Sequence, residues 1–245
     1  MSRKPFDVLI TGRLILGALF GMCWAQLILG FMLKHNGQTK LDENSFPQMI
    51  LATVGMHGSI LLAVGGWLKF KRISWSEAFG FGQSPAIRSI IPGVLAAALF
   101  LPVGMLMQSG VVTVLKHFHI ETPPQLAVQT LHNIQSLGLQ IYMTVFAVLL
   151  APLAEEVAFR GVIYPALKQS RYPRAALWIT SILFGAIHCN LASFIPLTVL
   201  AMVLALPYEN TDNLLAPITA HSVFNIFNVI LLFAHDSFKD QPLAQ

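Results

Sequence analysis

The sequence has few charged residues for its length. Of 245 residues, only 11% are Asp, Glu, Lys or Arg, whereas 55% are hydrophobic. A soluble domain carries about 25% charged residues. A large core does not account for so wide a shortfall, so the solvent around the protein is lipid. The chain also has only two cysteines, Cys23 and Cys189, which form neither a CxxC nor a CxxCH pattern. Their scarcity argues against a disulfide framework and against a thiolate metal site.

The common hydrolase motifs are missing as well. The chain has no HExxH helix and no GxSxG turn, which excludes a standard zinc peptidase helix and a nucleophile elbow. No aspartate lies in the middle of an apolar run, which excludes a pair of catalytic aspartates. Water activated by a glutamate, with or without a metal ion, is then the simplest hydrolytic chemistry for the polar residues that remain.

Long apolar runs predict an all-α fold, a polytopic bundle of about seven transmembrane helices, with six to eight as the range. A helix needs about 20 apolar residues to cross a membrane. Such runs lie at 13–33, 47–68, 89–115, 138–167, 174–189, 191–207 and 213–234. Residues 118–136 are a candidate interfacial segment. We divide the chain into N-terminal membrane helices with their connections (1–136), a catalytic helical part (137–235) and a short polar tail (236–245).

The basic residues predict a cytoplasmic N-terminus. A net charge of +4 is compatible with nucleic-acid binding, but the basic residues lie in short loops beside apolar runs, so we expect no nucleic-acid partner. This orientation leaves Lys34, Lys40, Lys116 and Lys239 outside and Arg160 within a span. It places ten basic residues inside: Arg3, Lys4, Arg13, Lys69, Lys71, Arg72, Arg88, Lys168, Arg171 and Arg174. Ten against four agrees with the positive-inside rule.

One predicted span carries two glutamates and an arginine. Each charged residue at mid-membrane costs about 2.5–3.5 kcal/mol by insertion scales, so Glu155, Glu156 and Arg160 are unlikely to be there without a role. Glu156 and Arg160 are four residues apart, the spacing of an intrahelical ion pair, and we assign both to structural support. Glu155 points about 100° away on the helix. We therefore expect it to face a cavity, where a carboxylate can act as a general base.

Two other spans carry polar side chains at a similar depth. His188 ends one span, and His221 and Asn225 share a face of the last one. At 1.5 Å per residue, Glu155, His188 and Asn225 lie roughly 18–21 Å from the cytoplasmic ends of their helices, with His221 one turn shallower. An imidazole and an amide that project together can donate to an oxyanion, or help to hold a metal or a water. We predict a site formed by these four residues.

We assign only packing roles to the glycines of the first span and to the histidine of the second. Gly17 and Gly21 form a GxxxG pattern, which lets membrane helices approach closely. His57 is a lone histidine in the second span, and we interpret it as a hydrogen-bonded packing residue.

Three motifs of the C-terminal half resemble those of a known family. In order along the chain they are EExxxR (Glu155, Glu156, Arg160), FxxxH (Phe184, His188) and HxxxN (His221, Asn225). Together, on membrane helices, they are similar to the motifs of the CPBP family of CAAX-processing and bacteriocin-protection proteins. That family is also called Abi and includes the type II CAAX prenyl endopeptidases. The resemblance covers residues 140–232.

This resemblance implies an intramembrane endopeptidase built as an all-helical domain with a cavity open toward the cytoplasm. It further implies that Glu155 and His188 activate the attacking water, while His221 and Asn225 stabilise the oxyanion. The ion pair of the first motif would hold its helix in place. The expected substrate is a membrane-associated or lipidated peptide, and the expected location is a bacterial plasma membrane.

The cofactor and the catalytic role itself stay open at this point. Glu155, His188 and His221 could complete a zinc site with an open position, or could work without metal. We favour the metal-free reading, because Glu155 cannot readily be both a ligand and the free base. The alternative to an enzyme is a non-catalytic membrane binding or immunity protein with a structural polar network. A proton-coupled carrier is disfavoured, because no inverted repeat or pair of broken helices is evident.

Overall fold

The computed structural model describes residues 4–170 and 173–239, and side chains up to residue 234. Every regular element in these ranges is helical, which confirms the predicted all-α fold. The elements are α1 (Val8–His35), α2 (Phe46–Lys71), α3 (Trp75–Phe79), α4 (Ile87–His117), α5 (Leu126–Asn133), α6 (Leu137–Val145), η1 (Phe146–Leu150), α7 (Ala151–Glu156), η2 (Val157–Ile163), α8 (Tyr164–Lys168), α9 (Pro173–Ile187), α10 (Leu191–Thr211) and α11 (Leu215–Lys239).

Six helical stretches in the described ranges are long and apolar enough to cross a membrane. They are Val8–His35, Phe46–Lys71, Ile87–His117, Leu137–Lys168, Leu191–Thr211 and Leu215–Ala234. The expected span at 174–189 corresponds to α9, which has 15 residues and is shorter than the roughly 20 that a crossing needs. The count therefore lies within the predicted six to eight, and the chain is an integral, multi-pass membrane protein.

The segments between and beyond the spans differ in detail from the sequence prediction. The expected interfacial stretch 118–136 contains only the eight-residue helix α5, which is too short to cross a membrane. α11 continues to Lys239, so the predicted start of the polar tail at 236 falls inside a helix. Residues 240–245, together with Arg3 and Arg171 of the basic residues placed inside, lie outside the described residues.

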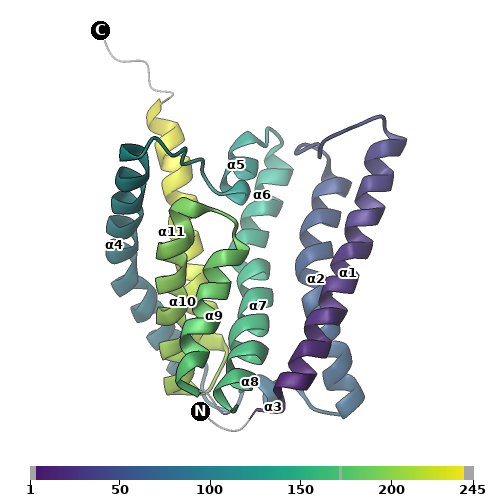
Figure 1. Ribbon diagram of the computed structural model, residues 1–245, viewed down its shortest axis with the longest axis vertical. Helices are drawn as coiled ribbons and strands as arrows, with labels where there is room; N and C mark the ends of the chain where they lie inside the picture. The colour runs from purple at the N-terminus through teal and green to yellow at the C-terminus, as the bar shows by residue number, and fades with distance from the viewer. Residues whose placement is uncertain (1–3, 171–172, 240–245) are drawn as a thin grey trace.

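The helices form two groups on either side of the stretch from α6 to α8 (Figure 1). α1 packs along α2 on one side, and α4, α9, α10 and α11 form the other side. α7 contacts both α2 and α11 and thus lies between the groups. The close approach of α1 to α2 needs glycine at Gly21, because a Cβ there would lie 2.9 Å from the Cβ of Ser59. The packing role predicted for the GxxxG pattern is therefore confirmed at Gly21.

Two π-helical segments bracket α7. η1 precedes Pro152, the second residue of α7, and η2 precedes Pro165, the second residue of α8. A proline ring clashes with the carbonyl four residues earlier and offers no N–H to it. A π turn widens the helix at that point, and such turns occur often at functional sites. The six residues of α7, which end in Glu155 and Glu156, are thus a short α-helical piece between two wide turns.

Candidate active site

Glu155 lies at the centre of a group of three histidines contributed by three helices. Its Oε1 is 3.4 Å from Nε2 of His57 on α2, and its Oε2 is 3.9 Å from Nε2 of His221 on α11. His188, at the end of α9, is also close enough to interact with its charge. Glu155 Oε2 is buried and has no hydrogen-bond partner among the residues that the structure describes. A buried carboxylate oxygen in that state is an unused acceptor, and here it faces the imidazole of His221.

Glu156 and Arg160 form the ion pair that their spacing predicts. Nη1 of Arg160 donates to Oε1 of Glu156 at 2.8 Å, and both side chains are almost fully buried. Nη2 of Arg160 donates to the carbonyl of Ala201 on α10, also at 2.8 Å. The guanidinium lies 4.8 Å from the ring centroid of Phe184, in cation–π contact. Arg160 therefore connects the span Leu137–Lys168 to α9 and α10.

Glu156 has a second contact, which its spacing along one helix does not reveal. Its Oε1 also lies 2.9 Å from Nδ1 of His221. A carboxylate at Nδ1 fixes the orientation of an imidazole and directs its other nitrogen away. Here the other nitrogen, Nε2, is directed to Glu155. Glu156 thus supports the site in two ways, by pairing with Arg160 and by holding His221.

His188 and Phe184 show why the FxxxH motif has its spacing. Nδ1 of His188 lies 2.7 Å from the carbonyl of Phe184, and a carbonyl only accepts, so Nδ1 carries the hydrogen. In the neutral ring, Nε2 is then an acceptor. The Phe184 ring also contacts both histidines, with its centroid 5.0 Å from that of His188 and 5.7 Å from that of His221. The motif places one aromatic ring against both imidazoles.

Asn225 lies on α11 and ties that helix to η1. Its Nδ2 donates to the carbonyl of Ala147 at 2.8 Å. The reason lies in the backbone of η1, where the N–H of Ala151 bonds to the carbonyl of Phe146, five residues back. The next donor in the same pattern would serve Ala147, but it belongs to Pro152, which has none. Asn225 supplies the missing donor and keeps a second N–H on the same nitrogen.

The packing role that the sequence gives His57 agrees with its bond to the Thr53 carbonyl and its ring contact with Phe146. The interpretation as a packing residue is incomplete, since His57 contacts Glu155. A usable signal was present, because His57 is the only titratable side chain in the predicted span 47–68. Titratable side chains inside a membrane are rare and usually functional.

The candidate zinc ligands do not fit a metal site. Glu155, His188 and His221 are neighbours, but within residues 4–170 and 173–239 no three His, Cys, Asp or Glu side chains converge in a way that could hold a metal ion. A catalytic zinc needs three protein ligands around one point. We derive no step of the reaction through a metal.

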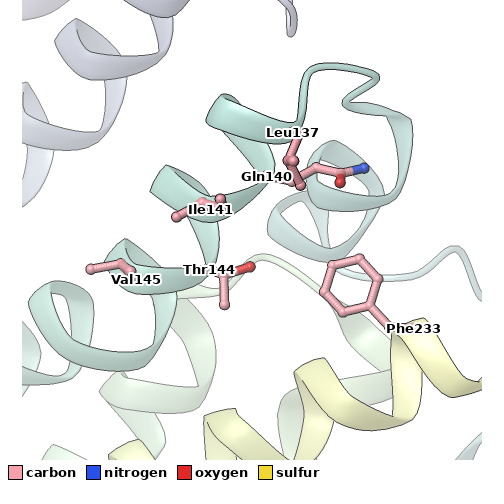
Figure 2. A pocket seen from close by; sticks show the side chains of 6 residues that line it. All are labelled: Leu137, Gln140, Ile141, Thr144, Val145 and Phe233. Carbon is pink, nitrogen blue, oxygen red and sulfur yellow. The ribbon is translucent and has the colours of Figure 1, made fainter.

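An apolar groove opens beside the site, between α6–η1 and α11. Its outer part is a hollow of about 350 Å³ bounded by residues of α6 and by Phe233 of α11 (Figure 2). A second hollow of about 270 Å³ shares Thr144 and Val145 with the first and extends to Val148 and Ile226. These last two residues directly follow Ala147 and Asn225, which are hydrogen-bonded to each other. The groove therefore lies along the same two segments, η1 and α11, that this hydrogen bond joins.

Comparison with known proteins identifies the part of the chain that carries this site. Residues 137–227 match the model of the Rce1-like family, described as type II CAAX prenyl endopeptidase Rce1-like. This range contains all three motifs, so the resemblance inferred from them is confirmed. No solved structure matches the chain significantly.

Two bacterial proteins show similarity to parts of the chain. The chain is 35% identical over 96 residues to "Uncharacterized protein YpbD" of Bacillus subtilis (strain 168), which covers 37% of the chain and 47% of that protein. It is 32% identical over 89 residues to "Putative membrane peptidase YdiL" of the same bacterium, which covers 36% of each. The chain thus spans less than half the length of these curated relatives.

Proposed function

We propose that this membrane protein is an endopeptidase in which Glu155 activates water to hydrolyse a peptide bond, a function supported by the match of residues 137–227 to the Rce1-like family model. The observation that carries the proposal is the buried, unpartnered Oε2 of Glu155, found within the described part of the chain. Nε2 of His221 lies 3.9 Å from this oxygen, and His57 and His188 interact with the same carboxylate group. A general base must lie within hydrogen-bond reach of the proton that it removes, and an unused carboxylate oxygen meets that need for a bound water.

In the proposed reaction, the water forms two hydrogen bonds as the donor, one to Oε2 of Glu155 and one to Nε2 of His188. Its oxygen attacks the carbonyl carbon of the scissile bond as Glu155 takes up a proton. The C–N bond then breaks, and the same proton passes to the leaving amine, so that Glu155 returns to its starting state. The bond from His188 to the Phe184 carbonyl supports this role, because it leaves Nε2 as the acceptor.

The oxyanion of the tetrahedral intermediate accepts hydrogen bonds from His221 Nε2 and from the second N–H of Asn225. Glu156 supports the first donor, because a carboxylate at Nδ1 stabilises the doubly protonated imidazole that can donate from Nε2. The hydrogen bond to Ala147 supports the second donor, because it fixes the plane of the Asn225 amide. Donors that are oriented before the reaction stabilise developing charge without reorganisation.

The proposed substrate is a membrane-associated or lipidated peptide. The apolar groove between α6–η1 and α11 supports this class, since it offers an apolar surface to a lipid chain or an apolar helix segment on the helix that carries Asn225. We place the cytoplasm on the side of α3 and α8, as the positive-inside distribution indicates, with the site open to that side of a bacterial plasma membrane. The proposed reaction needs no bound metal.

The test is cleavage by the full-length protein in lipid nanodiscs. The probes are two internally quenched peptides of one sequence, one with a farnesylated cysteine near its C-terminus and one unmodified. We expect cleavage of the farnesylated peptide that Glu155→Gln abolishes and that Glu121→Gln leaves unchanged, since Glu121 is an exposed loop residue. Activity should persist after chelation and removal of metal verified by elemental analysis, whereas loss that zinc restores would contradict the metal-free mechanism.

Two further outcomes would refute the assignment. Cleavage by the Glu155→Gln variant at the normal rate would exclude Glu155 as the base. If no probe is cleaved while the protein is folded, and Glu155→Gln leaves its cellular phenotype intact, the chain is the non-catalytic binding or immunity protein that the sequence left as an alternative.

A further inference from the structure

His57 is held in one orientation by groups on two helices. Its Nδ1 lies 3.2 Å from the carbonyl of Thr53, one turn earlier on α2, so Nδ1 donates. Its ring meets the ring of Phe146 edge to face, with centroids 4.9 Å apart and an interplanar angle of 83°. With one nitrogen engaged and the ring plane fixed, the direction of Nε2 is set. It is directed to Oε1 of Glu155 at 3.4 Å. Because a carboxylate oxygen only accepts, Nε2 donates in this contact and the ring carries a hydrogen on both nitrogens.

The part of α2 that carries His57 is hydrogen-bonded to the span Leu137–Lys168. The hydroxyl of Thr53 donates to the carbonyl of Met49 at 2.7 Å. It therefore accepts from the hydroxyl of Tyr142 on α6, which lies 2.6 Å away. On its other side, α2 is pressed against α1 at Gly55, where a Cβ would lie 2.4 Å from the Cβ of Ala25. These contacts hold the part of α2 around His57 between α6 and α1.

The contact with His57 gives the two carboxylate oxygens of Glu155 different surroundings. Oε1 faces His57, whereas Oε2 is buried and has no hydrogen-bond partner among the residues described. A carboxylate without such a contact could rotate about its last side-chain torsion, which is broad for glutamate. Engagement of one oxygen by an imidazole restricts this rotation. It leaves the other oxygen turned toward Nε2 of His221, 3.9 Å away.

We propose that His57 is a positioning residue of the active site, which holds Oε1 of Glu155 so that Oε2 is presented to the water. This inference rests on the proposed role of Glu155 as the base. Its consequence is that the active site extends beyond the Rce1-like match at residues 137–227 and includes α2.

The kinetic test compares His57→Leu with His57→Gln in full-length protein, with the farnesylated quenched peptide as the probe. His57→Leu should lower kcat about 10- to 100-fold and change KM less than about threefold, because misplacement of a catalytic group affects the reaction more than binding. His57→Gln, which keeps a side-chain donor at a similar reach, should restore kcat to within about fivefold of the natural protein. His117→Leu, at the outer end of α4, is the matched control and should leave both constants unchanged.

A normal kcat in His57→Leu, or an equal loss in His57→Gln, would overturn the inference. Comparison with Glu155→Gln distinguishes failure of this inference from failure of the proposed function. If Glu155→Gln is inactive while His57→Leu is normal, only the role of His57 is wrong. If Glu155→Gln retains activity, the base assignment fails first.

A thermal double-mutant cycle tests the contact without any substrate. Midpoints are measured for the natural protein, His57→Leu, Glu155→Ala and the double variant. Residues in direct contact are non-additive, and we expect a deviation of about 2 °C or more from the sum of the single shifts. Additive shifts would show that the two side chains do not interact in the membrane and would overturn the inference.

Discussion

Replacement of Arg160 by Met should destabilise the protein strongly without changing the size of the side chain much. The change removes the guanidinium from a site where three groups depend on it. They are the Glu156 carboxylate at 2.8 Å, the Ala201 carbonyl at 2.8 Å and the ring of Phe184 at 4.8 Å. Glu156 is fully buried and would keep only its contact to His221. The variant therefore contains a buried carboxylate whose main counter-charge is gone.

Removal of one partner from a buried ion pair costs about 3–5 kcal/mol of unfolding free energy. The lost cation–π contact is worth about 0.5–2 kcal/mol, but these contributions share one side chain and do not add fully. We therefore expect a total loss of about 3–5 kcal/mol for Arg160→Met. For a chain of this size, 1 kcal/mol shifts the thermal midpoint by about 2–4 °C, so the midpoint should fall by about 6–20 °C.

The assay is thermal unfolding in detergent, followed by tryptophan fluorescence, with a double variant and a surface control. Glu156→Gln in combination with Arg160→Met should recover at least half of the loss, because no uncompensated charge remains. Lys168→Met, which breaks the partly exposed pair with Glu209, should cost less than about 1 kcal/mol. A loss below about 1 kcal/mol for Arg160→Met, or no recovery in the double variant, would refute the assignment of this pair to structural support.

Two further predictions concern the backbone around the site. Asn225→Ala leaves the Ala147 carbonyl without a donor and should lower the unfolding free energy by about 1–3 kcal/mol in denaturant titration. Addition of Pro152→Ala, which supplies an N–H, should recover much of this loss, and no recovery would argue against the missing donor as its cause. Gly55→Ala should lower the thermal midpoint by several degrees, because the new Cβ would meet a side chain of α1 at 2.4 Å. Gly30→Ala, where nothing lies within 4 Å, is the control and should show no loss.

Most of the fold could be predicted from the sequence because the lipid environment simplifies the problem. Backbone groups in a membrane must be satisfied within their own segment, so a long apolar run is a helix almost by necessity. One predicted span differs from the structure: the stretch 174–189 corresponds to α9, whose 15 residues are too few to cross the membrane. Hydropathy also gives no sign of η1 and η2, since a π turn and an α turn can be made by the same apolar residues. The only indication in the sequence is the proline that follows each of them, Pro152 after η1 and Pro165 after η2.

The site was predictable where its residues share one helix, and less so where contacts join different helices. The Glu156–Arg160 pair follows from a spacing of four residues. The contact of Glu156 with His221 and that of His57 with Glu155 join different helices, and periodicity along one helix carries no information about them. Asn225 shows a third case, because its contact with Ala147 depends on a missing backbone donor in another span.

The position of α7 between α2 and α11 has a consequence for the order in which the protein is made. α1 and α2 are synthesised first, so His57 enters the bilayer before its partner Glu155 exists. When the span Leu137–Lys168 follows, it brings two glutamates and an arginine into lipid, and only the Glu156–Arg160 pair is available within it. His221 arrives last, with α11. The span Leu137–Lys168 thus enters a membrane in which the contact partner of Glu155 is already present, whereas a chain that begins at α6 would have to insert Glu155 without it.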